Sequence, residues 1–204
     1  HFPDNIRPLE EMGYKYHYFY PASRTVNNKS QTGLAIFSKY PIADSARFKT
    51  MEGGHSEGFI YADIKFQNKI IRFFNTHLES IGMNRQDYGN VGNTETVKSI
   101  FGKLKTSYYL RSEQASELRQ EMDRGPYPVI FSGDVDDVPN SYCYFKVRGN
   151  MQDAFLKKGL GLGRTFQFVS PTLRIDYLMA DQRFKIDQFI KLNYKYSDYF
   201  AQMM

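Results

Sequence analysis

Three separate stretches of the sequence place acidic or imidazole side chains at the ends of short apolar runs. His77 ends one run, Asp134 follows a second, and Asp176 lies within a third. A further carboxylate, Asp198, lies near the carboxyl end of the chain. Because the ligands of α/β proteins gather beyond the ends of strands, we expect these side chains to share one pocket.

These residue types suit the hydrolysis of a phosphoric ester. A divalent cation needs hard oxygen ligands, which Asp supplies, and it polarises a phosphoryl oxygen. A carboxylate can deprotonate an attacking water, and an imidazole can stabilise charge on the phosphoryl oxygens. A structural interpretation competes for each residue, since a lone His often serves as a hydrogen-bond partner and clustered Asp often forms a turn. Asp176 resists that interpretation because burying an unpaired carboxylate is costly.

The spacing excludes two other ligand motifs. Asp134 and Asp136 open like an EF-hand calcium loop. The next ligand position is Val138 and the glycine position is Pro139, and no closing Glu follows. The glycine-rich segment 159–163 lacks the Lys-Ser/Thr pair of a P-loop.

Apolar runs and turn residues predict the elements that would position these groups. The runs 58–66 and 69–77, separated by two residues, predict a β-hairpin. Further strands are predicted at 14–20, 33–38, 128–132, 164–168, 174–179 and 184–192. Helices are predicted at 5–13, at 95–124 as two helices or one interrupted near 106–107, and at 142–147. Alternating strands and helices without a repeat predict one α/β domain.

The composition of the 204 residues is that of a folded soluble domain, because 41% are hydrophobic and 24% charged. The formal charge of +5 suits a polyanionic partner, such as nucleic acid or an anionic membrane, or simply a solvated basic surface. The single cysteine, Cys143, excludes an intramolecular disulfide. No run reaches the roughly 18–20 apolar residues of a membrane span within this chain, and localisation stays open.

Five segments occur in the order found in the endonuclease/exonuclease/phosphatase (DNase I-like) superfamily. They are GLAIFSKYPI (33–42), NTHLES (75–80), SGDVDDVPNS (132–141), GRTF (163–166) and RIDYLMA (174–180). The sequence therefore resembles this superfamily, and most of all a bacterial branch of it, over about residues 33–198. The resemblance implies a four-layer α/β sandwich, in which two mainly antiparallel sheets pack face to face between helices. It also implies a nuclease, phosphodiesterase or phosphatase that uses Mg²⁺ or Mn²⁺.

The resemblance implies a catalytic role for three residues by their positions in these segments. Asp134 matches the general base that activates water. His77 matches the histidine that contacts the phosphate or the leaving group. Asp176 matches the Asp that normally orients a histidine near the carboxyl terminus.

This chain departs from the superfamily pattern at two binding positions. Asp136 replaces an Asn that donates to the phosphate, and its carboxylate could ligate a metal instead. Tyr199 replaces the histidine near the carboxyl terminus, and its phenol could hydrogen-bond with Asp176. We therefore expect Asn75, Asp136 and Tyr199 to bind the phosphate. We expect Asp198 and Asp136 to bind the metal.

The superfamily begins with two strands that carry an Asn and a metal-binding Glu, and no segment before the predicted helix at 5–13 matches them. We therefore expect a single domain, 1–204, that lacks its first strands and comes from a longer parent, for which a membrane anchor is one option. We expect a monomer that acts on a phosphate ester, with nucleic acid among the candidates. The alternative is a catalytically impaired module on the same fold that binds phosphate or nucleic acid without turnover.

Overall fold

The structure is a computed structural model that describes residues 2–24, 31–49, 58–80, 94–166, 173–193 and 197–204. Its helices are α1 (Phe2–Glu11), α3 (Thr94–Arg124), α4 (Tyr142–Arg148) and α5 (Ala154–Lys158). The strands before α3 are β1 (Tyr16–Arg24), β2 (Gln31–Ser38), β3 (Ile42–Lys49), β4 (Gly58–Phe66) and β5 (Lys69–His77). Those after it are β6 (Val129–Asp134), β7 (Gln152–Asp153), β8 (Asp176–Ala180), β9 (Ile190–Leu192) and β10 (Ala201–Met203). Within these ranges, no helix combines the length and apolarity that a bilayer crossing needs.

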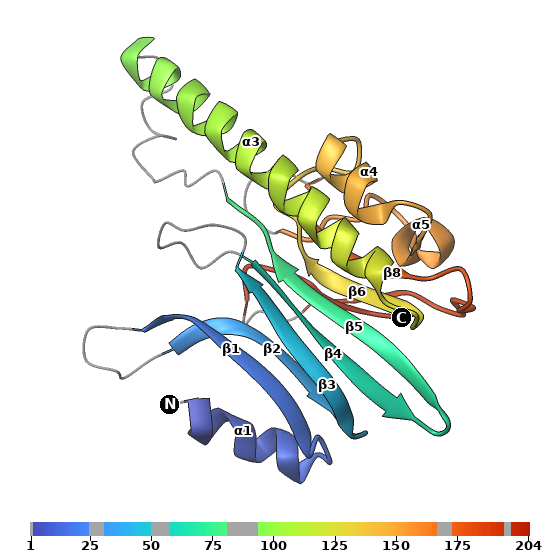
Figure 1. Ribbon diagram of the computed structural model, residues 1–204. Helices are drawn as coiled ribbons and strands as arrows, with labels where there is room; N and C mark the ends of the chain where they lie inside the picture. Colours follow the sequence, from blue (N-terminus) through green and yellow to red (C-terminus); the bar gives the residue numbers. More distant parts are fainter. Residues whose placement is uncertain (1, 25–30, 50–57, 81–93, 167–172, 194–196) are drawn as a thin grey trace.

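A six-stranded sheet with the order β3-β4-β5-β6-β8-β7 forms the centre of the molecule. Its strands pair antiparallel except for β5 and β6, which run parallel. Helices α3 and α4 lie on one side of this sheet, and the pair β1–β2 lies on the other side with α1 next to it (Figure 1). The α/β sandwich predicted from the sequence is therefore confirmed.

The two faces of the central sheet carry separate apolar cores. On the helix side, Leu118 and Met122 of α3 pack with Phe74 of β5 and with further buried side chains of β4, β6 and β8. On the other side, Phe73 of β5 packs in a second cluster with Ile36 of β2. Because side chains alternate along a strand, residues an even number of positions from Phe73 face the β1–β2 pair.

The predicted hairpin is confirmed, since β4 and β5 pair from Gly58 opposite His77 to Phe66 opposite Lys69. The predicted interruption of the long helix is wrong, because α3 is continuous over 31 residues. Ser107, at the expected break, turns its hydroxyl onto the carbonyls of Lys103 and Leu104 at 2.9 and 3.1 Å. A serine that bonds back to the preceding turn in this way stays within a helix.

The predicted strand 184–192 is wrong over most of its length, since only β9 is extended there. Asp181 accepts hydrogen bonds from the backbone N–H and the side chain of Arg183, which makes a turn where a strand was expected. Of the predicted strand 164–168, Phe166 forms a single bridge to Tyr199, and residues 167–168 lie outside the described ranges. The edge strand β3 was not predicted.

A buried ion pair joins the two strands of the hairpin. Asp63 and Arg72 lie opposite each other in the register of β4 and β5. Arg72 donates through Nε and Nη2 to the two carboxylate oxygens of Asp63, each at 2.7 Å. The guanidinium carbon also lies 3.9 Å from the centre of the Tyr61 ring. A bidentate pair that is also stacked on a ring holds the strand register strongly.

Replacing Asp63 with Ala is expected to lower the free energy of unfolding by about 3–5 kcal/mol, because Arg72 would keep an unpaired charge in a buried site. Denaturant titration measures this change. The matched control is Glu11→Ala, which removes an exposed pair with Arg7 and should change stability by less than about 1 kcal/mol. Equal effects of the two substitutions would contradict the proposed role of the buried pair.

Candidate active site

Three adjacent strands of the central sheet hold His77, Asp134 and Asp176 side by side. His77 ends β5 and lies opposite Asp134, which ends the parallel strand β6. Asp134 in turn lies opposite Asp176, which begins the antiparallel strand β8. These positions place all three side chains at one end of the sheet, where β5, β6 and β8 are neighbours (Figure 1). The structure therefore brings together the three residues predicted to be catalytic, and we call them the catalytic row.

The close approach of β5 and β6 depends on Gly133. A Cβ at this position would lie 2.5 Å from both the carbonyl oxygen and the Cγ2 of Thr76. Beyond the row the ladder continues, because Leu78 donates its N–H to the carbonyl of Asp134 at 3.0 Å. A glycine is therefore needed for His77 and Asp134 to sit in register.

Thr165, in the GRTF segment, holds the beginning of β8 in place. Its hydroxyl accepts hydrogen bonds from the backbone N–H groups of Ile175 and Asp176 at 3.0 and 3.1 Å. Its carbonyl accepts the N–H of Phe200 at 2.9 Å, which ties the carboxyl-terminal segment to the same place. This segment carries Tyr199, so the threonine links Asp176 and Tyr199 to one point of the fold.

Helix α3 clamps the chain directly after the catalytic row. Arg111 donates from Nη1 to the carbonyl of Glu79 at 2.7 Å, and Gln114 accepts the N–H of the same residue at 2.8 Å. Arg111 is fully buried, and its Nε lies 3.8 Å from Oδ2 of Asp137. Sequence reasoning did not single out Arg111. A signal existed, because Arg111 and Gln114 lie three residues apart, next to the apolar face that carries Leu118.

Asp134 is held by a backbone hydrogen bond. The N–H of Asp136 donates to its Oδ1 at 2.8 Å, and Asp136 adopts a φ of 52° to do so. Burial raises the pKa of Asp134, while this N–H, the nearby phenol of Tyr199 and the charges of His77 and Arg111 act in the opposite direction.

Tyr199 lies at the catalytic row, where the charges of both Asp134 and Asp176 act on its hydroxyl. Its expected hydrogen bond with Asp176 stays a prediction. Its backbone bridges to Phe166, and the centres of the two rings lie 5.0 Å apart. Burial and the nearby charge of Asp134 raise the pKa of its hydroxyl. The phenol therefore stays protonated at neutral pH and can donate a hydrogen bond at the row.

Two carboxyl groups beside Asp134 hold their protons unusually tightly. Burial, followed by the charge of Asp134, raises the pKa of Asp136 to about 7. The same two causes raise the pKa of Asp176 to about 8. Within the described residues, Oδ2 of Asp176 is buried and has no hydrogen-bond partner. This crowding of carboxyl groups favours either protons or a bound cation between them.

The other predicted site residues have different surroundings. Asn75 is on the same face of β5 as His77, and its amide donates to the carbonyl of Ala35 on β2 at 3.0 Å, which joins the two sheets. Asp198 is exposed, and among the described residues its carboxylate forms no hydrogen bond or ion pair with the catalytic row. The predicted roles of Asn75 in phosphate binding and of Asp198 in metal binding stay predictions.

In the part of the chain that the structure describes, no group of three or more His, Cys, Asp or Glu side chains is arranged to hold a metal ion. Mg²⁺ does not require such a group, because it is commonly held by one or two carboxylates together with water and phosphate oxygens. Asp136 and the unpartnered Oδ2 of Asp176 fit that smaller requirement.

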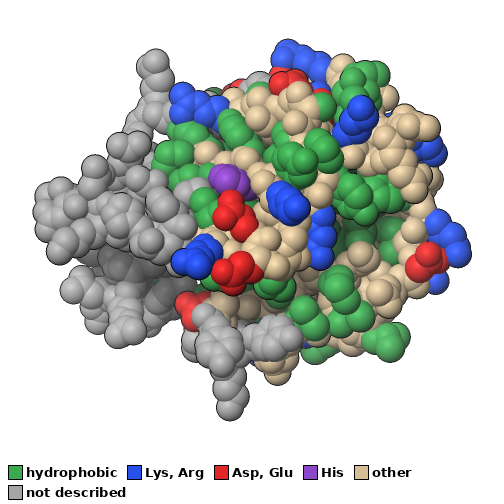
Figure 2. All heavy atoms as spheres, turned by 90° about the horizontal axis from the view of Figure 1, so that it is seen from below, with side chains coloured by type: hydrophobic (Ala, Val, Ile, Leu, Met, Phe, Trp, Pro, Cys, Tyr) green, Lys and Arg blue, Asp and Glu red, His purple; other side chains and the backbone are tan. Residues whose placement is uncertain are grey.

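On one face of the molecule, the excess of basic residues does not form a patch that would locate a substrate-binding surface. On the face that Figure 2 shows, Lys and Arg side chains are interspersed with acidic and hydrophobic ones instead of forming one continuous cationic patch. Net charge alone therefore does not locate a substrate on this face.

Solved structures with this fold include beta toxin from Staphylococcus aureus, at 17% identity and a TM-score of 0.65 over 98% of this chain and 80% of that one. An endonuclease/exonuclease/phosphatase family protein from Bacteroides thetaiotaomicron has 16% identity and a TM-score of 0.65 over 98% and 76% of the two chains. The human Nocturnin catalytic domain, solved with a bound sulfate anion, has 17% identity and a TM-score of 0.61 over 100% and 70%. No protein-family profile and no curated protein matches the sequence.

The chain therefore has the fold of the endonuclease/exonuclease/phosphatase (DNase I-like) superfamily, as its sequence motifs implied. At identities of 14–17% the likeness establishes the fold. The chemistry must be argued from the residues of this chain.

The raised pKa of Asp176 predicts how stability depends on pH. The folded state keeps this proton up to about pH 8, whereas a carboxyl with the ordinary pKa of 3.8 loses it near pH 4. The contribution of Asp176 to stability therefore falls as the pH rises from about 4 to about 8. Asp176→Asn should melt at least about 2 °C above the unsubstituted protein at pH 9 in a chelator, and with little difference at pH 4.

Thermal unfolding followed by circular dichroism measures this difference. Asp123→Asn is the control, because Asp123 is exposed and forms its ion pair with Arg119 of the same helix. A melting difference for Asp176→Asn that is the same at both pH values would contradict the burial of a strained carboxylate.

Proposed function

We propose that this chain hydrolyses phosphoric esters, either phosphodiesters or phosphomonoesters, at the catalytic row. The observation that carries the proposal is the register of β5, β6 and β8, which sets an imidazole and two carboxyl groups next to one another. The fold supports it, because proteins of this fold include a mannosyl-6-phosphatase from Bacteroides thetaiotaomicron and a sphingomyelinase C from Streptomyces griseocarneus.

Asp134 is the proposed general base. Burial raises its pKa, which strengthens it as a proton acceptor from water. The hydrogen bond from the N–H of Asp136 orients the carboxylate, so that one face of it is available to a water molecule. The proton that leaves the water is held at a carboxylate oxygen of Asp134.

His77 is proposed to stabilise negative charge on the substrate, and Asp176 to avoid repelling it. The imidazole of His77 lies beside Asp134 and can donate to a phosphoryl or leaving-group oxygen. Asp176, with a pKa of about 8, carries a proton at pH 7 in the absence of a cation. A neutral carboxyl at this position avoids a further negative charge next to the phosphate.

The carboxylates of Asp136 and Asp176 would hold a divalent cation, Mg²⁺ or Mn²⁺, whose remaining ligands would be water and phosphate oxygens. A bound cation of this kind polarises a phosphoryl oxygen. The raised pKa values of both groups imply that binding such a cation releases protons.

One observation favours the alternative of a binding module without turnover. Asp134 already accepts the N–H of Asp136, and the phenol of Tyr199 beside it can occupy a lone pair that a base would use on water. In such a module the row would bind a phosphate group, and Asp134 would serve only to position Tyr199 and the loop after β6.

Replacing Asp134 with Ala is expected to lower kcat by about 10²–10⁴-fold, the usual contribution of a positioned base. Hydrolysis of bis(p-nitrophenyl) phosphate with Mg²⁺ measures the rate. Asp123→Ala is the control, since it removes an exposed acid from α3 and should leave kcat unchanged. A binding module would show no Asp134-dependent hydrolysis, and Asp134→Ala would leave its affinity for a phosphate ligand equal or higher.

Divalent cations are expected to stabilise the protein through Asp136 and Asp176. At a hundred times its Kd, Mg²⁺ or Mn²⁺ should raise the melting temperature by on the order of 5 °C at pH 8. The double replacement of both residues by Asn should abolish this increase, whereas Asp123→Asn should keep it. An unchanged response in the double variant would remove these two carboxylates from the proposed cation site.

A further inference from the structure

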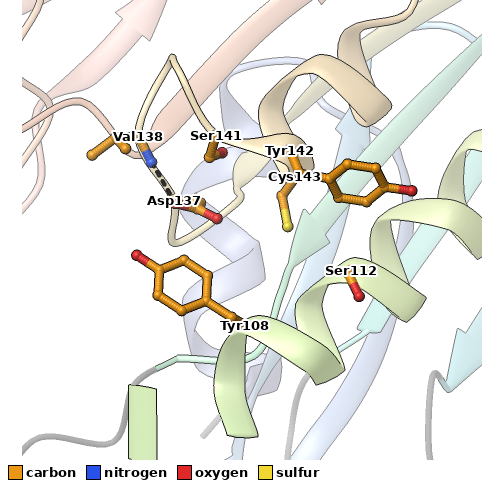
Figure 3. A pocket seen from close by; sticks show the side chains of 7 residues that line it. All are labelled: Tyr108, Ser112, Asp137, Val138, Ser141, Tyr142 and Cys143. Carbon is orange, nitrogen blue, oxygen red and sulfur yellow. Dashed lines mark hydrogen bonds between the residues drawn. The ribbon is translucent and has the colours of Figure 1, made fainter. Parts of the chain in front are cut away.

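A pocket of about 390 Å³ lies between α3 and α4, next to the loop that follows β6. Figure 3 shows the side chains around it, with the Tyr108 ring reaching from α3 toward the Asp137 loop. Tyr142, at the start of α4, lines the pocket too, and Tyr108 and Tyr142 are 47% and 60% exposed. A volume of this size, with exposed rings in its walls, is large enough for one aromatic ring system of a ligand.

A guanidinium group packs against the Tyr108 ring. The guanidinium of Arg111, which is fully buried, lies 4.8 Å from the centre of the ring. A ring fixed by a cation on one side has little freedom to lose when a second ring stacks on it. Tyr108 is therefore a prepared stacking surface.

A buried ion pair lies in the wall of the pocket. Asp137 is 4% exposed and lines the pocket. Its Oδ1 accepts the N–H of Val138 at 2.9 Å, and its Oδ2 lies 3.8 Å from Nε of the buried Arg111. Cys143, which also lines the pocket, stays neutral because burial raises its pKa to about 12. The carboxylate is therefore already paired, and the exposed rings are the part of the pocket that can hold a nucleobase, by stacking.

The face of α3 that enters the pocket continues outward as an exposed aromatic and basic stripe. Phe101, Lys105, Tyr108 and Ser112 follow one another at spacings of four, three and four residues, so they lie on one side of the helix. Phe101 is 69% exposed, and Lys105 is exposed. Figure 1 shows this amino-terminal half of α3 extending past the central sheet. Rings that alternate with a cation suit the bases and phosphates of a single strand.

The pocket lies at the loop that follows the catalytic row. Asp137, which lines it, is adjacent in sequence to Asp136, and the charges of Asp137 and Arg111 both act on Asp136. Arg111 also acts on Asp134. A strand along α3 would therefore pass near the carboxyl groups beyond β6.

We propose that this pocket binds one base of a single-stranded nucleic acid and that Phe101 and Lys105 bind the neighbouring nucleotide. The inference rests on the proposed phosphoesterase function and narrows its substrate class to single-stranded DNA or RNA. Stacking on Tyr108 holds the base, and Lys105 binds a phosphate.

Fluorescence anisotropy of fluorescein-labelled 12-residue DNA and RNA strands, in EDTA so that no hydrolysis occurs, measures the binding. Tyr108→Ala and Phe101→Ala should each weaken binding on the order of ten-fold. Tyr108→Phe should retain it, and Lys105→Glu should weaken it and flatten its dependence on salt. The control is Leu160→Ala, which removes a side chain that is 96% exposed and lies outside α3. The DNA and RNA arms decide which nucleic acid is preferred.

A strand of the same length built from abasic tetrahydrofuran phosphates separates this inference from the proposed function. It offers phosphodiesters without bases, so Tyr108→Ala should leave its binding and its Asp134-dependent hydrolysis unchanged. If neither strand is hydrolysed but Tyr108→Ala still weakens binding of the base-containing strand, the proposed activity is overturned and the pocket assignment stands. Equal affinity of Tyr108→Ala and the unsubstituted protein for the base-containing strand, or no binding by the latter, would overturn the pocket assignment.

Discussion

Strand β6 can approach β5 at the catalytic row only because position 133 has no Cβ, since any side chain there would collide with the backbone of Thr76. This close parallel pairing sets His77 beside Asp134, and the antiparallel pairing of β6 with β8 adds Asp176. The clamp from Arg111 and Gln114 then holds the chain that leaves β5. The pairing of the backbone strands thus sets the positions of the side chains in the site.

The same pairing creates an electrostatic cost that the surrounding structure offsets only in part. Neighbouring carboxyl groups compete for ionisation, and burial adds to the penalty, so Asp136 and Asp176 retain protons near neutral pH. The buried guanidinium of Arg111 opposes this for Asp134 and Asp136. Such a site favours cation binding, because a cation reduces the repulsion between neighbouring carboxylates that bound protons otherwise remove. The proposed chemistry and the proposed metal follow from one imbalance of charge.

Arg111 lies between the carboxyl groups of the site and the pocket formed by α3 and α4. It contacts the chain after β5, lies near Asp137 and supports the ring of Tyr108. The pocket between α3 and α4 therefore shares a wall with the acidic loop of the site. Helix α3 continues past the sheet and provides exposed surface beyond the catalytic row. A polymeric substrate could contact this surface, whereas a small phosphate ester would contact only the row.

The sequence by itself determined the fold class, the β4–β5 hairpin and the order of the motifs, because these depend on local turns, alternation and short segments. Tertiary structure alone decided that Tyr199 lies next to Asp134, since that position depends on how Thr165 and Phe166 seat the carboxyl-terminal segment. It also revealed Arg111, because a helical arginine shows its burial only when the loop after β5 packs on it. Local patterns determine strands and turns, whereas hydrogen bonds between residues more than thirty positions apart depend on the packing of the whole domain.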